Sequence, residues 1–121
     1  MSIKKTLVLG ASSNPEQFSH LAVKKLVAAS HPVEAIGRDV FMIDGVPVGN
    51  SQQHHEGIDT VTIYLNVDRQ KAYETYILSL NPKRIIFNPG AENPSFFTEA
   101  RNKGIEVLEA CTLVMLSVGT Y

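Results

Sequence analysis

The chain has 121 residues, is 44% hydrophobic and 19% charged, and carries a formal net charge of −1 at pH 7. This size and composition predict a single globular domain over residues 1–121 with a sizeable buried core. The balanced charge gives no field that would attract nucleic acid or an anionic membrane, so we expect neither as a partner. The single cysteine, Cys111, excludes an internal disulfide and a cysteine-rich metal site.

The N-terminal segment does not predict export. Lys4 and Lys5 resemble the start of a charged leader, but the apolar run behind them stops at Gly10. That run is too short for a signal peptide or a membrane span, and we therefore expect a cytoplasmic protein.

Strand and helix patterns alternate along the chain. Short apolar, β-rich runs predict strands over residues 6–9, 33–36, 60–65, 84–87 and 105–108. Apolar residues at helical spacing predict helices from the end of loop 10–15 to residue 30, over 68–80 and 94–103, and from 111 to 116. Asp44-Gly45 predicts a small hairpin over 41–48, followed by a polar loop over 49–57.

This alternation predicts a doubly wound α/β fold with a mainly parallel sheet of about five strands and helices on both faces. In such a sheet the ligand lies outside the carboxyl ends of the strands. The rule selects four loops on one edge as the candidate site, over residues 10–15, 37–38, 65–69 and 88–92.

The loop after the first predicted strand is typical of a phosphate-binding turn. Backbone N–H groups in such a turn and in the first helical turn have no partners of their own, and the helix dipole adds positive potential there. We therefore expect a nucleotide-like cofactor at the residues of this loop, Gly10, Ala11, Ser12, Ser13, Asn14 and Pro15. A tight turn without a ligand is the alternative, and Ser19 either caps the helix or contacts the ligand.

The other loops favour a phosphorylated adenosine over NAD. The dinucleotide fingerprint G-x-G-x-x-G is absent, and the second strand ends in Gly37-Arg38 rather than in an acid. A guanidinium there suits a phosphorylated ribose, because its fork can pair with a phosphate. NADP and coenzyme A both carry such a ribose, while a solvated surface arginine is the other interpretation of Arg38.

Two segments resemble the small stand-alone CoA-binding proteins. They are Gly-Ala-Ser-Ser-Asn-Pro at residues 10–15 and Asn-Pro-Gly-Ala-Glu-Asn at residues 88–93. The resemblance covers nearly the whole chain, includes the downstream Gly-Ile-Glu-Val-Leu-Glu-Ala-Cys run, and extends to the CoA-binding domain of the succinyl-CoA synthetase α subunit. It implies a Rossmann-like fold with coenzyme A, or an acyl-CoA, as the ligand.

The same resemblance implies a role for each loop. Residues 10–15 would hold the CoA diphosphate at the start of the first helix. Gly37 and Arg38 would meet the adenosine portion, although family members often carry Pro or Asn with a basic residue there, and residues 41–55 are not diagnostic. The implied contacts beside the pantetheine are Leu65, Asn66 and Val67. The implied contacts from the last loop are Asn88, Pro89, Gly90 and Glu92.

Signals for chemistry are weaker than signals for binding. His54-His55 with Glu56 is interpreted as a solvated loop in preference to a metal site, and Cys111 as a core side chain in preference to a reactive thiol. We find no paired carboxylates and no Ser–His–Asp arrangement. The sequence thus favours a binding or regulatory module without its own catalysis. A small NADP-dependent oxidoreductase and a CoA-binding subunit of a larger acyl-CoA ligase or transferase are the alternatives.

The C-terminal segment is apolar. Residues 113–116 and Val118 are predicted either to cover a helix or to face a second subunit, which would make the protein a homodimer.

Overall fold

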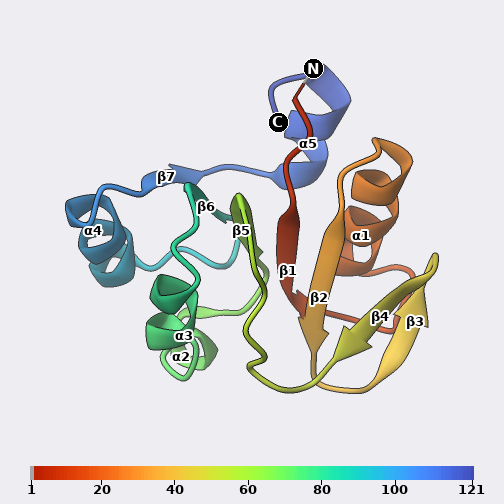
Figure 1. Cartoon of the computed structure of the whole chain (residues 1–121), viewed down its shortest axis with the longest axis horizontal. Coiled ribbons are helices and arrows are strands. Elements are labelled where there is room, and N and C mark those ends of the chain that lie inside the picture. The colour runs from red at the N-terminus through yellow and green to blue at the C-terminus, as the bar shows by residue number, and fades with distance from the viewer. Residues whose placement is uncertain (1) are drawn as a thin grey trace.

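The computed structural model describes residues 2–121 and is built on one seven-stranded sheet (Figure 1). The strands are β1 Thr6–Ala11, β2 Val33–Gly37, β3 Phe41–Ile43, β4 Val46–Gly49, β5 Thr60–Ile63, β6 Arg84–Phe87 and β7 Glu106–Glu109. Their spatial order is β3-β4-β2-β1-β5-β6-β7. Only β3 runs antiparallel to its neighbour; every other pair is parallel.

The α/β fold predicted from the sequence is thereby confirmed, with a correction to the number of strands. The expected parallel strands are β2, β1, β5, β6 and β7. The predicted hairpin is also present, but β4 pairs in parallel with β2 at Ala35 and Ile36, so the hairpin extends the sheet at its edge.

Within residues 2–121, four helices lie between strands and a fifth, α5, follows β7. They are α1 Phe18–Ala28, α2 Val67–Gln70, α3 Glu74–Ser79, α4 Pro94–Asn102 and α5 Thr112–Val118. The single helix expected over residues 68–80 is wrong, because the chain turns at residues 71–73 and separates α2 from α3. The Tyr73 N–H donates to the Gln70 carbonyl at 2.8 Å, a tighter turn than the α-helical one. None of these helices, within residues 2–121, is long and apolar enough to cross a membrane.

Helices cover both faces of the sheet, and β1 shows why. Leu7 and Leu9 pack into the cluster that contains Ile77 of α3 and Phe96 of α4. Val8, between them, packs into the opposite cluster with Leu26 of α1. Successive side chains of a strand point to opposite faces, so a strand covered on both sides has to be apolar throughout.

The point at which the sheet reverses its winding lies at β1. The chain passes from β1 through α1 to β2 on one side, and from β5 through α2 and α3 to β6 on the other (Figure 1). The neighbours β1 and β5 therefore send their connections in opposite directions. A crevice opens at such a switch point beside the carboxyl ends of the strands, which is where α/β proteins place their ligands.

A polar cluster closes the opposite, amino-terminal edge. The backbone N–H of Lys4 donates to His31 Nδ1 at 3.0 Å, and the His31 ring lies 5.0 Å from the ring of Tyr121. The guanidinium of Arg84 stacks on the same tyrosine at 4.4 Å from the ring centre. Burial lowers the pKa of His31 below its ordinary value, and the positive charges of Lys4 and Arg84 lower it further, against a small opposing effect of Asp59.

This lowered pKa predicts that stability falls with acidification. The unfolded state takes up a proton at His31 near pH 6.5 while the folded state still resists it, so the folded state loses stability as pH falls below that value. One extra proton bound by the unfolded state corresponds to at most about 1.4 kcal/mol per pH unit. Urea unfolding between pH 7.5 and 5 measures this slope, and His31→Asn is expected to flatten it. An unchanged slope in the variant would assign the pH dependence to other groups.

Candidate functional site

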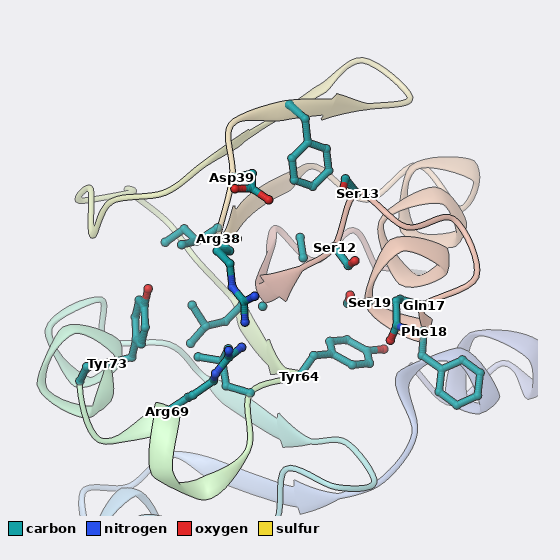
Figure 2. A pocket seen from close by; sticks show the side chains of 18 of the residues that line it. Ser12, Ser13, Gln17, Phe18, Ser19, Arg38, Asp39, Tyr64, Arg69 and Tyr73 are labelled. Carbon is teal, nitrogen blue, oxygen red and sulfur yellow. The ribbon is translucent and has the colours of Figure 1, made fainter.

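A cavity of about 730 Å³ opens at the carboxyl edge of the sheet (Figure 2). Its floor comes from the ends of β1 and β2, and its walls come from the start of α1, the residues after β2, and α2. The volume is within the range of small-molecule sites, about 300–1,000 Å³. The carboxyl-edge rule therefore located the cavity correctly.

Two glycines shape the floor. Gly10 has a φ of 97°, and a Cβ there would lie 3.0 Å from Leu65 Cδ2. At Gly37 a Cβ would lie 2.2 Å from the carbonyl oxygen of Ala11, closer than any real contact. The register of β1 against β2 shifts between Leu9 and Ala11, at this same crossing. Both glycines are thus required by the backbone, whatever occupies the cavity.

The loop after β1 is held by its own side chains. Ser12 Oγ accepts the Asn14 N–H at 3.1 Å, and Asn14 Oδ1 accepts the Glu16 N–H at 3.0 Å. Nδ1 of the buried His20 lies 2.8 Å from the Ser12 carbonyl oxygen and, as its donor, would hold that carbonyl against α1. Hydrogen bonds within the protein therefore hold this loop at three points.

The start of α1 faces the cavity with N–H groups that find no partner within residues 2–121. Its N-cap, Gln17, makes no side-chain cap bond, and the first N–H with a helical acceptor is that of Leu21, which donates to the Gln17 carbonyl at 3.1 Å. The expectation that Ser19 caps this helix is wrong, because Ser19 lies inside the first turn, where it is buried and lines the cavity. An uncapped helix start of this kind favours an anion.

Tyr64 also lines this side of the cavity, and its hydroxyl points toward the start of α1 in Figure 2. The hydroxyl oxygen itself is buried and makes no hydrogen bond of ordinary geometry within residues 2–121, although the Thr112 and Thr62 hydroxyls lie close enough to act on its pKa. Burial raises the pKa of Tyr64, so the group remains a protonated donor across the physiological range.

The opposite side of the cavity carries charged side chains. Arg38 and Asp39 follow β2, and Asp68 and Arg69 belong to α2. Tyr73 completes this wall (Figure 2). The site thus has a backbone donor side at α1 and a guanidinium side across from it.

The structure brings part of the predicted site together. The predicted residues that do line the cavity are Gly10, Ala11, Ser12, Ser13, Ser19, Gly37, Arg38, Leu65 and Pro89. The residues outside its lining are Asn14, Pro15, Asn66, Val67, Asn88, Gly90 and Glu92.

Several residues outside the lining have structural partners instead. Asn66 accepts the Arg69 N–H at 3.0 Å and caps α2. Asn88 donates to Thr62 Oγ1 at 2.7 Å and accepts the Thr112 N–H at 2.9 Å, which attaches the start of α5 to β5. Short polar side chains bond readily to nearby backbone, so these two asparagines have a structural role, and their contact with a ligand stays a prediction.

Sequence reasoning missed side chains on both walls. They are Gln17, Phe18, Asp39, Phe41, Tyr64, Ala72 and Tyr73, while Asp68 and Arg69 fall in the selected loop 65–69 but were given no role. Asp39 follows directly on Gly37-Arg38, so an acid does stand one position beyond those residues. Arg69 lies within loop 65–69, which was selected because it follows the carboxyl end of a strand. Its positive charge was the available signal for an anion-binding role.

Buried amides fix the loops after β5 and β6. The fully buried Gln70 donates from Nε2 to the Leu65 carbonyl at 2.8 Å and to the Ala91 carbonyl at 2.6 Å. Its Oε1 accepts a bond from Asn93 at 3.0 Å. One side chain therefore joins α2 to two loops, and α2 carries Arg69 on the cavity wall.

These features define a Rossmann-like α/β protein with a cavity at its winding switch. The sequence matches the CoA binding domain family over residues 4–117, and the chain belongs to that family. This confirms the resemblance noted above and supports association with CoA in general.

Solved structures share the fold. A crystal structure of an uncharacterized protein is 42% identical over 100% of both chains, with a TM-score of 0.97. A Thermus thermophilus protein is 20% identical with a TM-score of 0.86, covering 98% of this chain and 91% of that one. A hypothetical protein from Pyrococcus horikoshii OT3 is 18% identical with a TM-score of 0.86, covering 96% and 83%. No curated protein gives a significant match.

The crossing at Gly37 predicts a large effect of one methyl group. Gly37→Ala forces its Cβ against the Ala11 carbonyl, and we expect a loss of about 1–3 kcal/mol in the free energy of unfolding. Gly49→Ala is the matched control, because a Cβ there meets nothing within 4 Å. Urea unfolding of both variants checks this, and equal stabilities would contradict the crossing.

The amide network predicts a second loss. Gln70→Met keeps the volume of the side chain but leaves the Leu65 and Ala91 carbonyls without their donor, and we expect a cost of about 2 kcal/mol or more. Gln53→Met, at an exposed position, is the control. The same unfolding measurement applies, and a neutral Gln70→Met would argue that water replaces the amide.

Proposed function

We propose that the protein binds coenzyme A or a short acyl-CoA in the cavity at the carboxyl edge, as a binding or regulatory module without catalysis of its own. The carrying observation is the uncapped start of α1, which opens into a cavity of about 730 Å³ in a member of the CoA binding domain family.

The two sides of the cavity suit the two ends of the phosphorylated part of such a ligand. The diphosphate would accept bonds from the first N–H groups of α1, with the hydroxyls of Ser12 and Ser19 beside it. The phosphorylated adenosine would then lie toward Arg38. Leu65 and Pro89 offer apolar contact to the pantetheine arm.

The absence of catalysis is part of the proposal and is not decided by the lining. Within residues 2–121 the lining includes no histidine, cysteine or lysine, but it does include serine, tyrosine and aspartate side chains, which enzymes also use as nucleophiles and proton carriers. Cys111 precedes α5 and lies outside the lining. His54 and Glu56, which are hydrogen-bonded to each other, are exposed and also lie outside it.

Thermal unfolding in the presence of CoA, acetyl-CoA, NADP, NAD and ATP tests the proposal. A ligand present at about 100 times its dissociation constant, and bound only by the folded state, adds about 2.7 kcal/mol of stability. We expect a shift with CoA and acetyl-CoA and little with the others. A shift with NADP alone would instead favour the oxidoreductase alternative, and copurification with a large enzyme would favour a ligase or transferase subunit.

A substitution in the loop gives the matching loss. Ser12→Asp keeps an acceptor for the Asn14 N–H but puts a negative charge where the diphosphate would lie, and we expect the CoA-induced shift to disappear. Ser51→Asp makes the same change on an exposed loop outside the lining. Equal shifts in both variants would remove the loop from the binding site.

A further inference from the structure

Arg38 and Arg69 approach one cavity from two different elements. Arg38 follows β2 directly, and Arg69 is the third residue of α2. Figure 2 shows both side chains entering the cavity from its walls, with their guanidinium groups pointing toward one another. The two arginines are 31 positions apart in the sequence, and this spacing alone does not require their side chains to meet.

Neither guanidinium is neutralised by the protein. Within residues 2–121 neither arginine forms an ion pair with a carboxylate. Of the two acids on the lining, Asp68 pairs with Lys71 at 3.8 Å, and Asp39 makes no ion pair in the same part of the chain. Two positive groups that point at one another repel unless an anion lies between them.

The backbone under each arginine is held in place. Asn66 accepts the N–H of Arg69 itself, and Gln70, the next residue, is fully buried by its bonds to two loops. Arg38 follows Gly37, whose position is fixed against the Ala11 carbonyl. The bases of the two side chains are therefore positioned before a ligand arrives, and only the side chains have to order.

We propose that Arg69 and Arg38 together bind a phosphomonoester on the ribose of the ligand, at a subsite separate from the start of α1. The inference rests on the proposed binding of a phosphorylated adenosine and adds Arg69 as the residue that determines specificity. A dianionic phosphate can accept bonds from two guanidinium forks at once, and each such bond is charge-assisted. A diphosphate held at α1 leaves this subsite for the ribose phosphate alone.

The phosphomonoester could belong to CoA, at the 3′ position, or to NADP, at the 2′ position. Isothermal titration calorimetry with CoA, dephospho-CoA, adenosine 3′,5′-bisphosphate, adenosine 2′,5′-bisphosphate and AMP separates these sources. The proteins are the wild type, Arg69→Gln, Arg38→Gln, and Lys71→Gln as control. Lys71 follows α2 immediately, is exposed and does not line the cavity, so its substitution removes the same charge from the same segment. Its pair with Asp68 is long, at 3.8 Å, and exposed on both sides, so the loss of that pair should change binding little.

We expect Arg69→Gln to weaken CoA binding about tenfold or more, and dephospho-CoA binding less than about twofold. Lys71→Gln should bind both ligands as the wild type does. Unfolding without ligand checks that Arg69→Gln is folded, as expected for an exposed side chain whose backbone N–H keeps its bond to Asn66.

Each other outcome has a definite meaning. Equal weakening of CoA and dephospho-CoA, or equal behaviour of Arg69→Gln and Lys71→Gln, would overturn the subsite while leaving CoA binding in place. Selective binding of the 2′-phosphate, lost in Arg69→Gln, would keep the subsite and overturn coenzyme A as its ligand. A wild-type protein that binds none of the five compounds would overturn the proposed function and the subsite with it.

Discussion

The close crossing of β1 and β2 is the constraint on which the site depends. Because Gly37 has no side chain, the Ala11 carbonyl can approach to 2.2 Å from the place a Cβ would occupy. This approach accompanies the register shift of β1 between Leu9 and Ala11, where Gly10, still within the strand, has a φ of 97° that suits glycine. The direction in which α1 starts and the point from which Arg38 leaves the sheet both follow from this crossing.

Buried side-chain amides hold the other loops of the site in place by hydrogen bonds to their backbone. An amide can donate and accept at once, so a single buried Gln70 satisfies carbonyls from two loops while accepting a bond from Asn93. Asn88 does the same between β5, β6 and α5. The loop backbones beside the cavity thus find hydrogen-bond partners within the protein.

The sequence predicted the fold and the edge of the site because periodicity and turn residues carry that information. The apolar run of β1 required cover on both faces, and the parallel order then placed the loops together. The direction of a polar side chain is not encoded in this way. Asn66 and Asn88 could equally face a ligand or their own backbone, and only packing decided it. Arg69 was missed because a regular helix over 68–80 gives no reason for it to face the cavity.

The two sides of the cavity differ in what they can distinguish. In the proposed complex, the N–H groups at the start of α1 are fixed by the helix and suit the diphosphate of any nucleotide. These N–H groups supply affinity at little entropic cost, but they do not discriminate between nucleotides. Arg38 and Arg69 are exposed and lose side-chain freedom on binding, which offsets part of their attraction. Discrimination then comes from their mutual repulsion, because a ligand without a ribose phosphate leaves two facing positive charges unpaired, whereas one with it relieves both.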